Sequence, residues 1–230
     1  MSEKKRKLVV FSGAGMSAES GISTFRDSGG LWEKHSIEEV ATPQAFGQNP
    51  KKVLEFYNHR RRQLYEVEPN EAHYKIAELD TKFDTTVITQ NVDNLHERAG
   101  SERVLHLHGE LDKGRSSVDE TVIVDLKGKD IKLGDKAPDG SQLRPHVVWF
   151  GEAVPAMSEA MEEVQKAEIL IVVGTSLQVY PAAGLVDVCN PDCEIYYIDP
   201  QGEPWPNPKL TVIKEKASIG MKKLAQKFNL

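Results

Sequence analysis

Short apolar runs alternate with helical patterns along almost the whole chain. Apolar runs of strand length occur at Lys7–Phe11, Thr85–Thr89, Arg103–Leu107, Val147–Phe150, Glu168–Val173, Glu194–Ile198 and Leu210–Ile213. Apolar positions at helical spacing predict helices at Gly15–Ser20, Lys51–Tyr65, Glu71–Thr81, Val92–Ala99, Met157–Lys166 and Ile219–Phe228. This alternation predicts an α/β fold with a mostly parallel sheet.

Residues 110–142 differ from this pattern. They are rich in glycine and charge, and alternating runs such as Thr121–Val124 predict small antiparallel strands. We expect a single domain over residues 1–230, with a core at about 1–33, 82–108 and 146–230 and a smaller lobe at about 34–81 and 109–145. Catalytic clefts commonly lie between two such lobes.

The first apolar run leads directly into Gly13-Ala14-Gly15-Met16-Ser17-Ala18, a match to the G-x-G-x-x-G/A pattern of dinucleotide-binding loops. Glycines turn tightly and let the backbone approach a pyrophosphate, and a following helix N-terminus offers free N–H groups. A glycine-rich turn without a ligand is the alternative. The preceding strand and the polar tail Glu19–Arg26 favour a dinucleotide site, and therefore a Rossmann-like sheet with helices on both faces.

Polar residues follow several predicted strands, where an open α/β sheet binds its ligands. Gln90, Asn91 and Asp93 could bond ribose hydroxyls and a carboxamide, although Asn91 or Asp93 could instead cap the next helix. His108 ends its strand before a glycine and is a candidate general base, whereas His106, earlier in the strand, is a candidate structural histidine.

Two further groups follow later strands. Gly174-Thr175-Ser176 offers N–H and hydroxyl donors to a phosphate, and Asp199 could accept a ribose hydroxyl or begin a turn with Pro200. Neither group by itself is a specific signal of a nucleotide site.

Composition narrows the class of protein. The net charge of −6 over 230 residues argues against generic nucleic-acid binding. No apolar stretch reaches membrane-spanning length and residues 1–7 lack the apolar segment of a signal peptide, so we expect no membrane partner and a cytoplasmic location. Cys189 and Cys193 are the only cysteines, which leaves no disulfide framework.

Taken together, the motifs resemble one family, the sirtuins, which are NAD-dependent protein lysine deacylases. The segments that carry the resemblance occur in the family's order and are GAGMSAESGISTFR, TQNVDNLH, HLHGE, LRPHVVWFGE, GTSLQVYPAAGL and ASIGMKKL. The resemblance covers nearly the whole chain apart from residues 110–142. It implies that NAD is consumed as a cosubstrate, releasing nicotinamide and O-acyl-ADP-ribose, and that no hydride is moved.

The resemblance also implies roles for individual residues. His108 and Asn91 would be catalytic, with His108 taking a proton from a ribose hydroxyl. An extended acyl-lysine peptide would pair with Val147, Val148, Trp149, Phe150, Gly151 and Glu152. NAD would be bound by Gly13, Ala14, Gly15, Glu19, Phe25, Arg26, Trp32, Gln90, Asn91, Val92, Asp93, Gly174, Thr175, Ser176, Asp199, Pro200, Gln201 and Ala217.

Three further positions match the subgroup of the family that accepts acidic acyl chains: Ala41, Tyr57 and Arg60. Tyr57 and Arg60 share a helix face, and a phenol with a guanidinium can bind a terminal carboxylate. Ala41 would leave room for a longer chain. The alternative is an exposed basic face at residues 60–62 with Tyr57 packing in the core. We expect desuccinylase or demalonylase activity beside deacetylation.

One feature departs from the family. Most sirtuins hold a structural zinc with two cysteine pairs, but residues 109–146 contain no cysteine and offer only Asp, Glu and His146. We therefore expect no zinc, and a lobe held by packing among Val118, Val122, Val124, Leu126, Ile131 and Leu133. A monomer is expected. The alternatives to a deacylase are an NAD-dependent ADP-ribosyltransferase and a non-catalytic NAD or ADP-ribose sensor.

Overall fold

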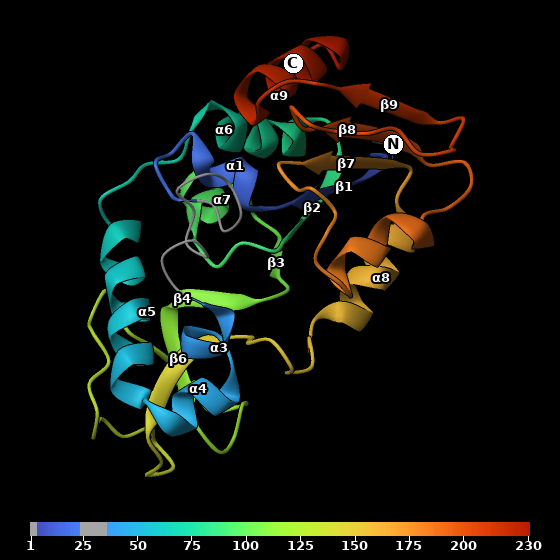
Figure 1. The fold of residues 1–230 in the computed structure, drawn as a ribbon. Coiled ribbons are helices and arrows are strands. Elements are labelled where there is room, and N and C mark those ends of the chain that lie inside the picture. Colours follow the sequence, from blue (N-terminus) through green and yellow to red (C-terminus); the bar gives the residue numbers. More distant parts are fainter. Residues whose placement is uncertain (1–3, 24–35) are drawn as a thin grey trace.

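The computed structural model describes residues 4–23 and 36–230, and two β-sheets organise them (Figure 1). The larger sheet is parallel throughout, in the order β3-β2-β1-β7-β8-β9. Its strands are β1 (Lys7–Ser12), β2 (Asp84–Thr89), β3 (Val104–His106), β7 (Ile169–Val173), β8 (Glu194–Ile198) and β9 (Leu210–Ile213). The predicted parallel sheet is therefore confirmed.

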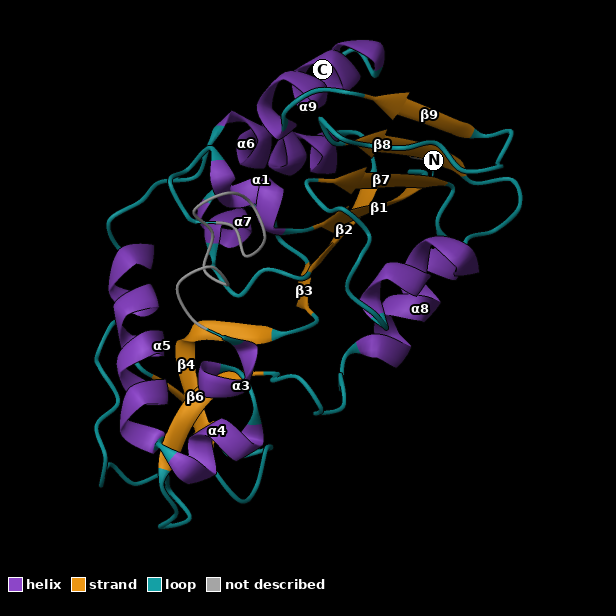
Figure 2. Cartoon of the chain, in the orientation of Figure 1, coloured by secondary structure: helices purple, strands orange, loops and turns teal. Residues whose placement is uncertain are grey.

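Helices cover both faces of this sheet (Figure 2). On one face, Leu8 and Val10 of β1 pack with α6 (Glu71–Glu78) and α9 (Ala217–Lys227). On the other, Val9 and Phe11 pack with α8 (Met157–Lys166) and the 3₁₀ helix η2 (Ala182–Val188). A strand buried on both faces must be apolar at every position, which is why β1 is a continuous apolar run.

The smaller sheet is antiparallel, in the order β5-β4-β6, and lies beside three helices. Its strands are β4 (Gly109–Ser116), β5 (Ile123–Asp125) and β6 (Leu143–Val147), and its helices are α3 (Ile37–Val40), α4 (Pro43–Gln48) and α5 (Pro50–Leu64). Asn49 caps α5 by accepting the N–H of Lys52, and Pro50 stands at the first helical position, where its missing N–H costs nothing.

The remaining elements are short. α1 (Ala14–Ala18) follows β1, α7 (Leu95–Arg98) follows the loop after β2, and the 3₁₀ helix η1 (Leu79–Thr81) precedes β2. Within the described ranges, no helix has the length and apolar character needed to cross a membrane.

Several sequence predictions were wrong. The run Val147–Phe150 does not form a strand of its own, because Val147 ends β6. The three N–H groups that follow donate to three different segments rather than to one neighbouring strand. The helix expected from Val92 begins only at Leu95, whose N–H is accepted by the Asp93 carboxylate. The helix at 71–78, expected in the smaller lobe, packs instead on α9 and the larger sheet.

The smaller sheet is anchored to α5 by buried polar contacts. Asn58 forms two hydrogen bonds with the backbone of Ile131, donating at 2.8 Å and accepting at 2.9 Å. Arg61, fully buried, donates to the carbonyl oxygens of Leu111 and Lys129. These contacts join the helix to the cysteine-free segment.

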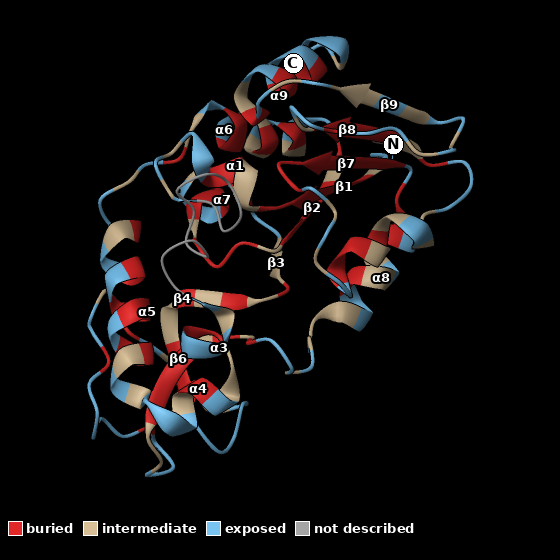
Figure 3. Cartoon of the chain, in the orientation of Figure 1, coloured by how far each residue is buried: buried red, intermediate tan, exposed pale blue. Residues whose placement is uncertain are grey.

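Packing in this segment differs in part from the expectation. Leu126 and Ile131 are buried and Val122 and Val124 pack against them, but Val118 and Leu133 are exposed. The strands β1 and β7 of the larger sheet are buried along almost their whole length (Figure 3). Across residues 4–23 and 36–230, no group of three or more His, Cys, Asp or Glu side chains is placed to hold a metal ion.

The buried histidine His73 predicts acid sensitivity. Burial lowers its pKa to about 4, and the nearby Glu97 only partly opposes this. An unfolded histidine titrates near ~6.5, so below that pH the unfolded chain binds a proton that the folded chain refuses. The stabilisation that comes from keeping His73 neutral is fully present above pH ~6.5 and is lost as the pH falls from there towards 4. At pH ~5 the loss of folding free energy is about 2 kcal/mol.

His73→Gln is expected to reduce this acid sensitivity, because glutamine keeps an acceptor for the Asn70 N–H but cannot be protonated. The measurement is urea unfolding of both proteins at two pH values, one neutral and one mildly acidic. Equal losses of the free energy of unfolding in the two proteins would contradict this assignment.

Candidate active site

A cavity of about 650 Å³ lies where the carboxyl ends of β1, β2, β7 and β8 meet the smaller lobe. Parallel sheets bind their ligands at this edge. Residues named by the sequence analysis supply most of its lining: Ala14, Gly15, Glu19, Ala41, Tyr57, Arg60, Gln90, Asn91, Val92, His108, Val147, Val148, Trp149, Phe150, Gly151, Glu152, Gly174, Thr175, Ser176, Asp199, Pro200, Gln201 and Ala217.

The glycine loop touches the loop after β7 backbone to backbone. The Gly15 N–H donates to the Gly174 carbonyl at 2.8 Å, and a Cβ on Gly174 would lie 2.2 Å from the Met16 nitrogen. Gly174 also has a φ of +61°, which favours glycine. Gly13 packs against Thr175 and is not part of the cavity lining. Glycine is therefore needed at these positions for the two loops to pack against each other.

The side chains after β2 hold this loop in place. Asn91 donates through its amide nitrogen to the Gly13 carbonyl and to the Ser17 hydroxyl, both at 3.0 Å. Asp93 accepts from the Ser17 hydroxyl at 2.9 Å, and it lies outside the cavity lining. Burial raises the pKa of Asp93, although the hydrogen bonds from Ser17 and Leu95 oppose the shift. The structure therefore gives Asn91 and Asp93 positioning contacts.

His108 has the arrangement of a general base. Its Nδ1 lies 3.0 Å from the Gln90 carbonyl oxygen, which can only accept, so Nδ1 carries the proton. The neutral ring therefore has an unprotonated Nε2, and the side chain lines the cavity. Burial lowers the pKa of His108, with the Gln90 bond opposing it, so the neutral form dominates at pH ~7.

His106 contrasts with His108. Its Nδ1 lies 3.1 Å from the Asn91 carbonyl oxygen and its Nε2 lies 2.7 Å from the Glu97 carboxylate. Burial alone would lower the pKa of His106, but the bond and charge of Glu97 raise it overall. With both ring nitrogens engaged, His106 is a structural residue.

The far end of the cavity carries a phenol and a guanidinium from one helix face. Tyr57 and Arg60, both on α5, are 3% and 7% exposed and line the cavity with Ala41. The indole N–H of Trp149 donates to the Tyr57 hydroxyl oxygen at 3.0 Å. Burial raises the pKa of Tyr57 to about 12, so the phenol keeps its proton. The exposed basic face considered above does not exist at Arg60 and Arg61, which are both buried.

The segment from Val147 to Glu152 borders the cavity, but its amides are partly occupied. The Val148 N–H donates to the His108 carbonyl at 2.9 Å, and the Phe150 N–H donates to the Ala41 carbonyl at 3.0 Å. The Trp149 N–H donates to the Glu152 carboxylate at 2.7 Å. A bound peptide would have to use other backbone groups of this segment.

The opposite end of the cavity is built at the ends of β7 and β8. Gln90, which follows β2, donates to the hydroxyl of Thr175, which follows β7, at 3.2 Å. Asp199 accepts the Gln201 N–H at 2.9 Å, and Glu19 accepts the N–H and hydroxyl of Ser218 near the start of α9.

Sequence reasoning missed part of the lining: Ala18, Val154, Val179, Tyr180, Pro181, Ile198 and Lys216. Val179–Pro181 lie within the GTSLQVYPAAGL segment, which was a usable signal. The predicted NAD contacts at Phe25, Arg26 and Trp32 lie outside the described residues.

Comparison with known proteins decides the family. The Sir2 family model matches residues 13–181. The chain belongs to the Sir2 family. The resemblance to sirtuins seen in the sequence is thereby confirmed.

Similar proteins carry informative names. The Sir2 chain is 55% identical over 224 residues to an NAD-dependent protein deacylase of Helicobacter pylori (strain ATCC 700392 / 26695), covering 97% of each chain. It matches the structure of a Sir2 homologue in complex with NAD at a TM-score of 0.86 and 41% identity, covering 96% of this chain and 89% of that one. It also matches the structure of a Sir2 mutant with a deacetylated p53 peptide and 3′-O-acetyl-ADP-ribose at a TM-score of 0.81 and 29% identity, covering 97% and 94%.

Proposed function

We infer that this Sir2 chain is an NAD-dependent protein deacylase in which His108 is the general base. The observation that carries the role of His108 is its geometry: Nδ1 is held by the Gln90 carbonyl and the neutral ring lines the cavity. A base held in one tautomer needs no reorganisation before it accepts a proton.

The residues present fit NAD. Gly15 and Gly174 both line the cavity and place no side chain in it, which suits a closely approaching pyrophosphate. Thr175 and Ser176 offer hydroxyls, and Asp199 offers a carboxylate for ribose hydroxyls. When bound, NAD supplies the ADP-ribose that accepts the acyl group as nicotinamide leaves.

The chain's own residues then have defined tasks. We propose that the Nε2 atom of His108 accepts a proton from a ribose hydroxyl, so that the hydroxyl oxygen can attack the acyl carbon. Asn91 keeps the Gly13 carbonyl and the Ser17 hydroxyl in place beneath the cosubstrate. The segment from Val147 to Glu152 borders the entrance for an extended acyl-lysine peptide.

We also propose that the enzyme accepts acidic acyl groups such as succinyl and malonyl. The support is the burial of Tyr57 and Arg60 side by side on α5, lining the cavity with the small residue Ala41. A guanidinium shielded from water binds a carboxylate more strongly than an exposed one does. We further propose a monomeric protein acting in the cytoplasm, where its cosubstrate NAD is available.

One experiment separates deacylation from the alternatives. The protein is incubated with NAD and an acyl-lysine peptide, and the products are identified by mass spectrometry. Deacylation gives free lysine and O-acyl-ADP-ribose. A protein product heavier by one ADP-ribose would indicate an ADP-ribosyltransferase, and no product would indicate a sensor.

A further inference from the structure

Trp149 joins the acyl end of the cavity to an ionic cluster of Arg115, Arg144 and Glu152. Its side chain is 2% exposed, and its indole N–H is bonded to the Tyr57 hydroxyl. An indole N–H can only donate, so the Tyr57 oxygen is the acceptor. A phenol carries one hydrogen, and no described residue accepts the hydrogen of Tyr57.

We propose that Trp149 is a specificity-determining positioning residue for acidic acyl groups. By occupying a lone pair of the Tyr57 oxygen, it leaves the Tyr57 hydrogen for an acceptor inside the cavity. The terminal carboxylate of a succinyl or malonyl group is such an acceptor, whereas an acetyl group has no terminal acceptor. This inference rests on the acyl preference proposed above and names a further residue that sets it.

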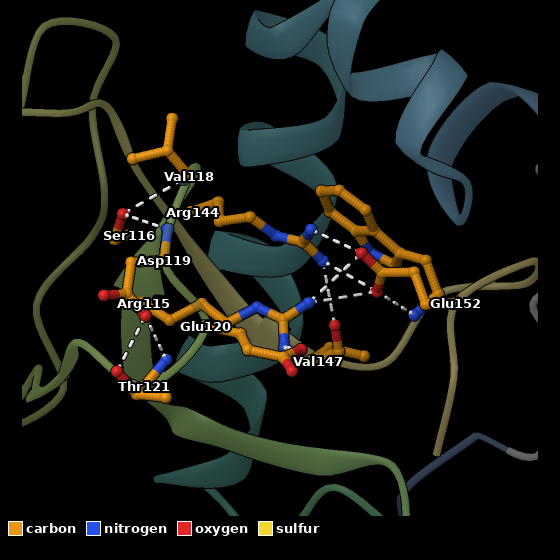
Figure 4. A network of polar contacts seen from close by, with 10 residues as sticks. Arg115, Ser116, Val118, Asp119, Glu120, Thr121, Arg144, Val147 and Glu152 are labelled. Carbon is orange, nitrogen blue, oxygen red and sulfur yellow. Dashed lines mark hydrogen bonds and ion pairs between the residues drawn. The ribbon is translucent and has the colours of Figure 1, made fainter. Parts of the chain in front are cut away.

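The ionic cluster holds Trp149 in place. Glu152 accepts from both Arg144 and Arg115, at 2.7 Å and 3.1 Å, and these side chains converge in Figure 4. The same carboxylate accepts the Trp149 backbone N–H at 2.7 Å. The Arg144 guanidinium lies over the Trp149 ring, 3.3 Å from its centroid. The Trp149 backbone is therefore fixed by the half-buried Glu152, and its ring face by the buried Arg144.

The position of Arg144 also affects the strength of the bond to Tyr57. A cation over the face of an indole draws electron density from the ring. The ring N–H becomes a stronger donor as a result, because hydrogen bonds in a network polarise one another. The Phe46 ring, with its centroid 5.3 Å away, also packs against Trp149. The cluster thus fixes the position of Trp149, and through it the position of the Tyr57 hydroxyl at the acyl end of the cavity.

The test uses Trp149→Phe, which keeps an aromatic ring for Arg144 and Phe46 but removes the N–H. The KM for a succinyl-lysine peptide is expected to rise by about 3–10-fold, the usual effect of losing one hydrogen bond. The matching acetyl-lysine peptide is the reference for this change, because Trp149 lies in the segment that borders the peptide entrance and its replacement can affect both peptides. The ratio of the succinyl KM to the acetyl KM is therefore expected to rise by the same factor. Trp205→Phe, at a tryptophan packed on Tyr197 away from the cavity lining, is the matched control.

A double-mutant cycle makes the test specific to the bond. In a Tyr57→Phe background, Trp149→Phe should have no further effect on the succinyl KM. An equal rise in KM for both peptides, or an effect that persists without the Tyr57 hydroxyl, would overturn the role of Trp149. The proposed acyl preference fails separately, if Arg60→Met affects both peptides equally.

Discussion

Replacing Arg60 with methionine is expected to lower kcat/KM for a succinyl-lysine peptide by about 10–150-fold. This range corresponds to the loss of a hydrogen bond between charged groups, about 1.5–3 kcal/mol. The acetyl-lysine peptide should change by less than about threefold, because it presents no carboxylate to the guanidinium. Methionine fills a similar volume without charge, so the cavity wall that Arg60 forms with Tyr57 and Ala41 is largely kept.

Arg62→Met on the same helix is the matched control. Arg62 is exposed and pairs with Asp130 at 2.5 Å, so its removal changes the charge of α5 without touching the cavity. The measurement is steady-state kinetics with succinyl, malonyl and acetyl versions of one peptide. If Arg60→Met slows all acyl groups alike, the carboxylate pocket is refuted and Arg60 is a structural residue.

Replacing His108 with alanine is expected to lower kcat for deacylation by about 10²–10⁴-fold, the usual contribution of a general base. NAD binding should be kept, since the glycine loop is held by Asn91 and Gly174 rather than by His108. His59→Ala, an exposed histidine on α5, should retain full activity.

The pH dependence of the deacylation rate tests the role of His108 independently. Burial lowers the pKa of His108 from its ordinary value near ~6.5. A base is inactive when protonated, so the rate should fall only as the pH drops below ~6.5 and should be level above it. A profile that rises through pH ~8 would assign the base to another residue.

The sequence predicted the part of the fold that depends on local pattern. Leu8–Phe11 is apolar at every position, which predicts a strand buried on both faces, and the structure shows alternate residues in two different cores. The end of each such strand then marks the ligand edge of the sheet. For this reason the sequence alone could assign His108, Gln90 and Thr175, which follow different strands, to one site.

Features that depend on packing between distant segments could not be predicted in this way. Alternation did not distinguish Ile131, which is buried against Asn58, from Leu133, which is exposed on the same segment. The amphipathic pattern of residues 71–78 predicted a helix but not the sheet that it covers. The bond from Trp149 to Tyr57 joins residues 92 positions apart, and no local pattern indicates it.

The glycine loop illustrates an intermediate case. Its sequence predicted a close approach between backbone and ligand, and the structure adds a second glycine, Gly174, packed against it from the loop after β7. Asn91, implied by the resemblance as a catalytic residue, directs its amide nitrogen to Gly13 and Ser17. The motif identified Asn91 as a site residue, but its hydrogen-bond partners could be identified only from the folded structure.

The most direct test of the account is a count of products for the wild-type enzyme and for His108→Ala, incubated with NAD and an acetyl-lysine peptide. The wild type should release one nicotinamide and one O-acetyl-ADP-ribose for each lysine freed, and none without NAD. The variant should bind NAD and free almost no lysine. Lysine freed by the variant at the wild-type rate, or by the wild type without NAD, would contradict the account.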